Sequence, residues 1–319
     1  MQESTILYME MLNKLKKEEL TKIIDDYNKL AIIFDVEKIK IDKKDKKKDC
    51  LEKIDNIKEN YFKYLIMLLD LDDYKKLKRM VSKKINEEFI NDNEQLINYF
   101  ISKNIIVKED DLSILSDIKE LLVKILKEKE VIKYIKNNTQ NYKLINGIVN
   151  AYGILDIKSF IKIVGEDYKL EILDYYYKKE YSLDKDKIIS DKLTNKTKIT
   201  KYLNNKKIKE FTNEEYMMLG DFTYHKKIKA YKKLIKLFKK YYVFENKDVS
   251  FVDDEIIKPY IYDNTSDDAK IFKNIEIVLD EYFEFRDDSL KNKIMNEITK
   301  IKEEMPLWDT RGYNKLEVK

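Results

Sequence analysis

The feature of this sequence that most constrains its fold is the near absence of residues that break helices. The 319 residues include five Gly and two Pro, which is far below their usual share of a globular chain. Because Gly and Pro end helices and shape tight turns, a chain that lacks them favours long helices joined by polar connections. We therefore predict a mainly α, multi-helix protein with one or two short β-hairpins.

The clearest hairpin signal lies in the stretch Glu94–Lys127. Apolar residues there follow one helical face until Asn104 interrupts them, and the β-branched run 105–107 is too short for a helix. Residues 112–115 alternate as a return strand does. A hairpin over 104–115 between two helices resembles the wing of a winged-helix module, which would imply contact with nucleic acid. The acidic turn 109–111 would repel phosphate, so a hairpin that only closes a helical layer is the alternative.

Length and composition indicate a soluble, folded chain. It is long enough for two or three domains with their own cores, and 24 Tyr and 13 Phe make it too apolar for wholesale disorder. The single cysteine, Cys50, excludes an intramolecular disulfide, which fits a reducing cytosol. Glu3 stands where a signal peptide would be basic, and the longest apolar run, 64–69, is too short to span a bilayer. We expect a cytoplasmic protein with no membrane partner.

The helical patterns divide the chain into three predicted modules. These are 1–54, 55–137 with the hairpin 104–115, and 138–319 with a basic helix 226–242 and a Trp-containing tail. The break between the second and third modules is placed at the polar run 137–141. Thr212 with Glu215 forms a capping-box pattern that predicts a helix start. Further short strands are predicted at 198–202 and 249–252.

The N-terminal module contains a repeated helix-start pattern. Lys17-Glu18-Glu19-Leu20-x-x-Ile23 is echoed by Lys48-Asp49-Cys50-Leu51-x-x-Ile54. Two short helices that begin in this way resemble the SAP and Rho N-terminal type of helix–loop–helix, although the connection 31–47 is longer than in those families. The resemblance implies nucleic-acid binding by the loop and the second helix.

Positive charge is concentrated in two segments. Residues 38–48 hold seven Lys against two Asp, and residues 196–240 hold fourteen Lys against four acids. Residues 245–319 are acidic, with nineteen acids against twelve Lys and Arg. Basic segments of this kind indicate phosphate-binding surfaces. They also fit a solvated linker, a solvated helix face, or a basic segment that packs on the acidic one.

The candidate nucleic-acid-binding residues come from these two segments. They are Lys38, Lys40, Lys43, Lys44, Lys46, Lys47, Lys48, Lys226, Lys229, Lys232, Lys233, Lys236 and Lys240.

The C-terminal tail carries the only Trp, in the pattern Trp308-x-x-x-Gly312-Tyr313-x-x-x-Glu317. A lone Trp in a tail predicts an apolar plug that docks on the last helices of the chain. The tail resembles that of uncharacterised Firmicute proteins, some from phages and plasmids, which share a Rho-N-like start and a Tyr-Gly-Ile/Val-Leu stretch like 152–155. In that group a Pro follows the aromatic residue where this chain has Lys315. The resemblance carries no activity that could be transferred.

Sites for bond-making chemistry are not recognisable. His225 is the only His and has no Ser or Cys partner at a recognisable spacing. Phosphate-cradling Gly-rich loops are absent, and pairs of adjacent acids recur too often to mark a metal site. We predict a non-enzymatic protein without cofactor or metal, associated with nucleic acid. The alternatives are a helical scaffold that binds an acidic protein surface and, more remotely, a metal-dependent nuclease. The sequence leaves the oligomeric state open.

Overall fold

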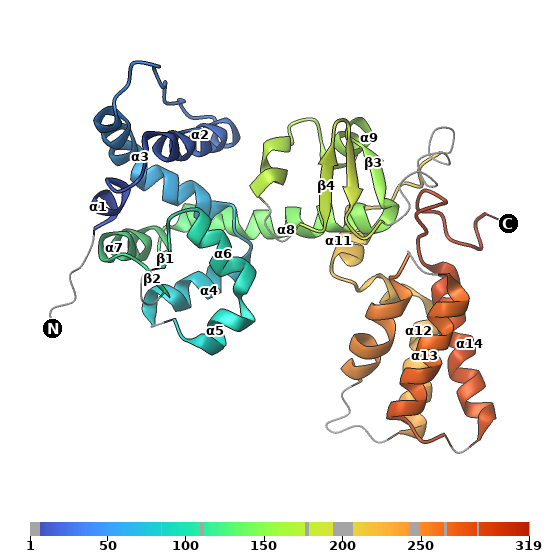
Figure 1. The fold of residues 1–319 in the computed structure, drawn as a ribbon. Helices are drawn as coiled ribbons and strands as arrows, with labels where there is room; N and C mark the ends of the chain where they lie inside the picture. The colour runs from blue at the N-terminus through green and yellow to red at the C-terminus, as the bar shows by residue number, and fades with distance from the viewer. Residues whose placement is uncertain are drawn as a thin grey trace. The chain divides into compact units, whose positions relative to one another are not determined.

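The computed structural model describes residues 7–83, 85–108, 112–175, 179–193, 207–242, 249–264, 267–285 and 287–318. Across these residues the protein is mostly helical and contains two small antiparallel sheets (Figure 1). The predicted mainly α fold with short hairpins is confirmed. The chain forms two compact units. Unit 1 is Met1–Tyr142 with Asp167–Lys178, and unit 2 is Lys143–Glu166 with Lys179–Lys319.

Unit 1 is built from helices and one small hairpin. Its helices are α1 (Tyr8–Leu12), α2 (Lys17–Phe34), α3 (Lys47–Met67), α4 (Leu71–Ser82), α5 (Glu87–Asp92), α6 (Glu94–Ser102), α7 (Ser116–Ile125), the first part of α8 (Lys129–Tyr152) and the 3-10 helix η1 (Leu170–Tyr175). Helices α2 and α3 pack together because each buries an apolar face. The boundary predicted at 54/55 falls inside α3.

The predicted hairpin is present, and it is shorter than the range 104–115. Strands β1 (Val107–Lys108) and β2 (Leu112–Ser113) pair antiparallel, with Val107 opposite Ser113. The helix, hairpin, helix order is confirmed by α6 and α7 on either side. The acidic turn 109–111 lies outside the described residues, and the role of the hairpin as a wing stays a prediction.

Residues 167–178 belong to unit 1, and one of the contacts that join them to it is made with Asp26 on α2. The Tyr175 hydroxyl donates to the Asp26 carbonyl oxygen at 2.9 Å and to its carboxylate at 3.1 Å. The same carboxylate accepts from Lys103 Nζ at 2.8 Å and from the Tyr61 hydroxyl at 2.9 Å. Four segments of unit 1 therefore meet at one half-buried acid.

The helix break predicted at 137–141 was wrong, because α8 runs without interruption from Lys129 to Tyr152; the two units divide within this helix, between Tyr142 and Lys143. The polar residues of this run serve neighbouring helix ends. The buried Asn138 side chain donates to the carbonyl oxygens of Leu68 and Leu69, at 2.6 and 3.2 Å, just after the last turn of α3. The Thr139 hydroxyl accepts from the backbone N–H of Leu71, the first residue of α4. The division into three modules stays a prediction.

Unit 2 combines a three-stranded sheet with a helical bundle. Its elements are the second part of α8, β3 (Ile154–Asp156), α9 (Ile157–Val164), β4 (Tyr181–Asp184), β5 (Lys187–Ser190), α11 (Asn213–Gly220), the 3-10 helix η2 (Tyr224–Lys227), α12 (Lys229–Tyr241), the π-helix η4 (Val252–Ile261), α13 (Asp268–Tyr282) and α14 (Asp288–Glu304). The antiparallel sheet has the order β3-β5-β4, with Ile154 opposite Ile189.

Two local predictions in unit 2 have opposite outcomes. Thr212 caps α11, and its reciprocal bonds with Glu215 form the predicted capping box. The strand predicted at 249–252 was wrong, because Ser250 and Phe251 are helical and η4 begins at Val252. Pro259 lies inside η4, where it contributes no N–H to the helical hydrogen bonds. The strand predicted at 198–202 falls outside the described residues.

The tail is a docked plug, but its partner differs from the prediction, because Trp308 packs on the end of α8 and on the sheet strands β3 and β5 and not on the last helices. Trp308 is buried, and its indole Nε1 donates to the carbonyl oxygen of Asn150 at 2.8 Å. Lys209 Nζ holds the carboxylate of Glu317 at 2.6 and 2.7 Å. None of the described helices combines the length and apolarity that crossing a bilayer would require.

Candidate functional site

Helix α12 presents a continuous basic surface. Its apolar side buries Ala230, Leu234 and Phe238, and the helix packs against α14. Every exposed lysine falls on the opposite side, because residues spaced by three, four and seven share a helical face. We call this set the basic face: Lys229, Lys232, Lys233, Lys236, Lys239 and Lys240. The predicted helix 226–242 is shorter than expected, and Lys226 and Lys227 belong to η2 instead.

The basic face carries charge that the described part of the chain does not neutralise. Helix α12 contains no acid. Lys226 and Lys227, just before it, are paired with Asp253 and Glu215. Within the described residues, by contrast, no acid pairs with a lysine of the basic face, and the one side-chain partner of the set is the ring of Tyr241, 5.0 Å from Lys240 Nζ. Packing of α12 on the acidic C-terminal third therefore uses apolar contacts and leaves this charge exposed.

A buried polar network fixes the start of α12. His225 is fully buried, and its Nδ1 and Nε2 atoms lie 3.1 Å from the Tyr262 hydroxyl and 3.2 Å from Asp253 Oδ1. The Tyr231 hydroxyl donates to the same Asp253 oxygen at 2.7 Å, and Lys226 Nζ lies 2.9 Å from Asp253 Oδ2. Asp253 on η4 thus holds both the segment just before α12 and a residue in the first turn of α12.

The electrostatics of this network favour an ionised Asp253. Burial alone would raise the pKa of the carboxyl group. Hydrogen bonds from His225, Tyr231 and Lys226 outweigh burial and hold the pKa of Asp253 well below its usual range. Both carboxylate oxygens of Asp253 have partners, which is the condition under which a buried carboxylate is stable.

The other end of η4 is held by a buried lysine. Lys302 on α14 is 2% exposed, and its Nζ donates to the carbonyl oxygens of Ile261 and Asp263 at 3.0 and 2.5 Å. Burial lowers the pKa of Lys302 to about 8. Helix α14 also packs on α12. The helix that carries the basic face is therefore held by Asp253 at the start of η4 and packs on α14, which binds the end of η4 through Lys302.

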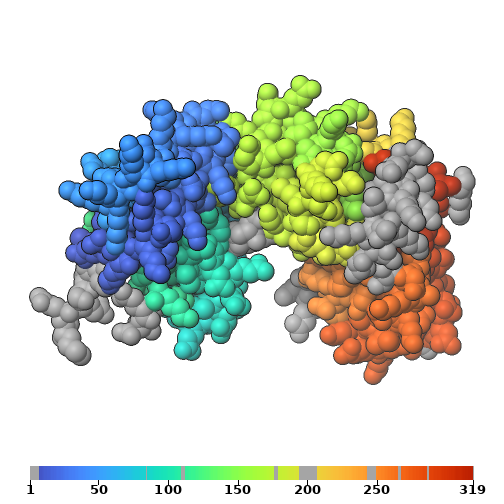
Figure 2. All heavy atoms as spheres, turned by 45° about the horizontal axis from the view of Figure 1, so that its top comes forward, coloured from blue at the N-terminus to red at the C-terminus, as the bar shows by residue number. Residues whose placement is uncertain are grey.

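The second predicted surface, the loop 38–48, has a defined conformation. The Asn28 side chain clamps Ile39, accepting from its N–H at 2.7 Å and donating to its carbonyl oxygen at 2.9 Å. Lys53 Nζ binds the Lys40 carbonyl oxygen and the Asp45 carboxylate. Figure 2 shows the blue N-terminal part of the chain, to which this loop belongs, as part of the surface of unit 1.

The predicted lysines of this loop differ in availability. Those with exposed side chains are Lys38, Lys40, Lys43, Lys44, Lys46 and Lys48. Lys47 lies in the first turn of α3, and its Nζ donates to the carbonyl oxygen of Asn13 at 2.5 Å. The loop lysines belong to unit 1 and the basic face to unit 2, so the predicted site residues form two surfaces in different units.

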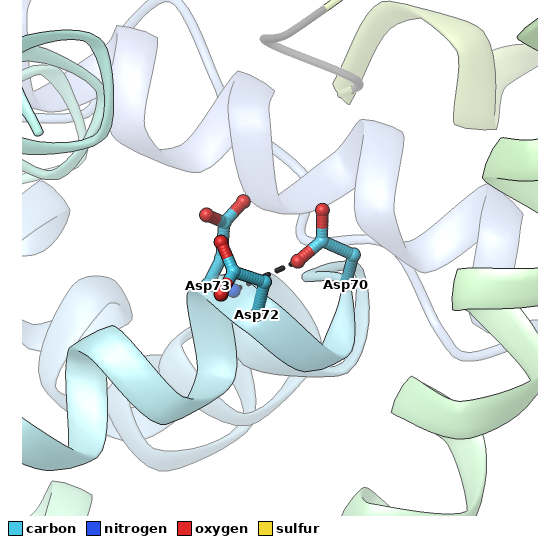
Figure 3. A group of neighbouring side chains, drawn as sticks. All are labelled: Asp70, Asp72 and Asp73. Carbon is cyan, nitrogen blue, oxygen red and sulfur yellow. Dashed lines mark hydrogen bonds between the residues drawn. The ribbon is translucent and has the colours of Figure 1, made fainter. Parts of the chain in front are cut away.

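A group of three acids at the start of α4 could suggest a metal site (Figure 3). Asp70 is the N-cap of the helix, and its carboxylate accepts from the N–H of Asp73 at 2.7 Å. Asp72 pairs with Lys76 at 2.7 Å. Acids in a first helical turn are favoured by the helix dipole. Capping by Asp70 and the favourable position of acids in a first helical turn therefore account for the group.

The single Cys and the single His of the chain are both placed in the core. Cys50 is fully buried, and burial raises the pKa of its thiol. His225 is enclosed by the network described above. Sequence patterns did not single out Asp253, Tyr231, Tyr262 or Lys302, because their partners lie in distant segments.

Comparison of the chain with models of known protein families, with curated proteins and with solved structures finds no match.

Proposed function

We propose that the protein is a non-enzymatic nucleic-acid-binding protein that contacts the phosphate backbone through the basic face of α12. The observation that carries the proposal is a set of exposed lysines on a helix without acids, five of which have no side-chain partner among the described residues. Unpaired surface charge of one sign attracts a polyanion and is neutralised by it.

The spacing of the basic face suits a backbone ligand. Lys229, Lys233, Lys236 and Lys240 form one stripe along the helix, which spans about 16 Å at the helical rise. Duplex DNA carries one negative charge per roughly 1.7 Å of its axis, so several phosphates lie within reach of such a stripe. Lysine acts there as a point charge and reads no sequence. We therefore expect binding with little sequence preference.

The loop 38–48 is the second, weaker surface of the proposal. Its exposed lysines and its resemblance to the SAP and Rho N-terminal type support contact with phosphate. Asp42 and Asp45 lie among these lysines, and Asp45 is paired with Lys53. A loop that keeps its own acids attracts phosphate less than a helix face without any.

A binding role without catalysis is supported by the burial of the reactive groups. Cys50 and His225 are both fully buried, and a general base must come within hydrogen-bond reach of the substrate. An acidic protein surface would match the charge of the basic face as well, and the experiment below separates the two ligands.

The test compares two variants of equal charge change. One replaces Lys229, Lys233, Lys236 and Lys240 by Gln. The control replaces four exposed lysines of unit 1, Lys75, Lys78, Lys133 and Lys136, by Gln. Fluorescence anisotropy with a labelled duplex of about 20 base pairs at about 50 mM salt measures both.

We expect the α12 variant to bind at least about tenfold more weakly than the control variant, which should bind as the unchanged protein does. The proposal fails if the unchanged protein binds no polynucleotide at this salt concentration, or if the two variants lose affinity equally. The first outcome would leave an acidic protein surface as the ligand of α12.

A further inference from the structure

Helix α13 has an outer face that the rest of unit 2 leaves open. Its inner side buries Ile271, Ile275 and Leu279 and packs against η4 and α14. On the outer side Ile277 is 55% exposed, the highest value among the large apolar residues that the structure describes. Figure 1 shows α13 in the helical bundle of unit 2 with η4 and α14. An apolar side chain this exposed at the middle of a helix indicates a contact surface.

The charges around Ile277 are arranged symmetrically and with opposite signs. Lys273 precedes Ile277 by four residues, and Glu281 follows it by four. All three side chains are exposed, and residues four apart share a helical face. Asn274 and Asp280, three residues to either side, lie on the same face. The stripe is therefore basic and amide-bearing before Ile277 and acidic after it.

Two of these charged side chains form no ion pair within the described part of the chain. Asp280 pairs with Lys291 at 2.7 Å, but neither Lys273 nor Glu281 has an acidic or basic partner among the described residues. They cannot pair with each other, because eight residues of helix separate them by about 12 Å.

From this arrangement we propose that α13 is an interface with a second copy of the same chain. The two helices run antiparallel about a two-fold axis through Ile277. This axis brings residues equally far before and after Ile277 into contact. Lys273 of each copy then meets Glu281 of the other, Asn274 meets Asp280, and the two Ile277 side chains meet at the axis. A two-fold interface must be self-complementary in this way.

Other ligands fit this face less well. Nucleic acid would be repelled by Glu276, Asp280 and Glu281, which crowd the second half of α13. A uniformly basic partner would match that half and would clash with Lys270 and Lys273 in the first half. A stripe of balanced charge with an apolar centre is complementary to its own antiparallel copy.

The strength of the dimer follows from its size. One helix pair is at the low end of specific interfaces, so we expect reversible association with a dissociation constant of about 10–100 μM. The interface lies on a different helix from the basic face and does not depend on the proposed function.

Charge exchange tests the pairing directly. Sedimentation velocity over a concentration series is run on Lys273→Glu, on Glu281→Lys and on the chain that carries both changes. Each single change places like charges opposite each other twice per dimer, and we expect the dissociation constant to rise at least about fivefold. The double change restores opposite charges, and its dissociation constant should return to within about twofold of the original value.

Two further variants complete the test. Ile277→Asp should leave the protein monomeric, and Lys293→Glu, an exposed lysine of α14 with the same change of charge, should leave the association unchanged. Circular dichroism melting confirms that each variant is folded. The proposal is overturned if the unchanged chain is monomeric up to about 500 μM, or if the double variant associates no better than the single ones. Binding of DNA by Ile277→Asp should persist, so failure of this interface and failure of the α12 proposal are separate results.

Discussion

The indole ring of Trp308 lies directly against Gly153. A Cβ atom at position 153 would stand 2.5 Å from Cδ2 of the indole, and Gly153 adopts a left-handed φ of +67°. The same residue ends α8, where its N–H donates to the carbonyl oxygen of Val149 at 2.8 Å. One glycine therefore ends the helix and provides the surface on which the tail docks.

Replacing Gly153 by Ala should destabilise unit 2 by about 2–4 kcal/mol, because left-handed backbone strain adds to a steric clash with the indole. Thermal unfolding followed by the fluorescence of the single Trp measures the change. Gly153→Asn separates the two causes, since Asn tolerates a left-handed backbone but still has a Cβ. We expect Gly153→Asn to be nearly as unstable as Gly153→Ala. Stability close to that of the unchanged protein would show that the indole does not require the glycine.

Replacing Asp253 by Asn should lower the free energy of unfolding by about 3 kcal/mol at pH 7, because a buried charged network loses its centre. The pKa of Asp253 is held below its unfolded value, so its contribution is complete above that value and is lost as the pH falls. Urea unfolding should therefore show a smaller difference between Asp253→Asn and the unchanged protein at about pH 3 than at pH 7. Tyr231→Phe, which removes one hydrogen bond to the same oxygen, should cost about 1 kcal/mol. A difference for Asp253→Asn that is independent of pH would argue against an ionised anchor.

The lowered pKa of Lys302 predicts that the stability of the protein depends on pH in the alkaline range. Its pKa falls from 10.5 in the unfolded chain to about 8 in the fold. Between these values the unfolded chain binds the proton and the folded chain does not, so this residue makes stability increase with pH by about 2 kcal/mol from pH 8 to pH 10. Lys302→Met should remove that increase. The control is Lys293→Met, which changes an exposed lysine of the same helix and should keep the slope of the unchanged protein. If the free energy of unfolding rose with pH equally in both variants, the lowered pKa of Lys302 would be contradicted.

Local patterns in the sequence predicted the elements whose signals are local. The capping box at Thr212, the β-branched run of the hairpin and the amphipathic spacing of α12 each depend on a few neighbouring residues. The Trp in a Gly- and Pro-bearing tail likewise indicated a buried plug, although not the end of α8 and the sheet on which it docks. Such features need no knowledge of distant segments.

The errors came from residues whose partners are distant. Asn138 and Thr139 belong to a polar run that is typical of a loop, yet in α8 their side chains serve the ends of α3 and α4. Gly147 and Gly220 also act through a distant segment. A Cβ on Gly147 would meet the carbonyl oxygen of Tyr216 at 1.7 Å, and one on Gly220 would meet that of Lys143 at 2.0 Å. These glycines let α8 and α11 approach closely, which no local pattern predicts.

The candidate site was predicted in part. The lysines of α12 were recognisable from their spacing, and the structure shows which of them lack partners. The polar network around Asp253 was not recognisable from the sequence. Asp253 belongs to one of many pairs of adjacent acids, and His225 is a single His without a partner nearby in the sequence. Their meeting depends on η4, a π-helix that begins where the sequence pattern favoured a strand at 249–252.

The salt dependence of DNA binding tests the central claim most directly. If Lys229, Lys233, Lys236 and Lys240 each neutralise one phosphate, the logarithm of the binding constant should fall with the logarithm of salt concentration with a slope of about −4 or steeper. Replacing these four residues by Gln should reduce that slope by about 3–4, and the unit 1 control variant should keep it. Equal slopes for the unchanged chain and the α12 variant would contradict the assignment of the phosphate contacts to the basic face.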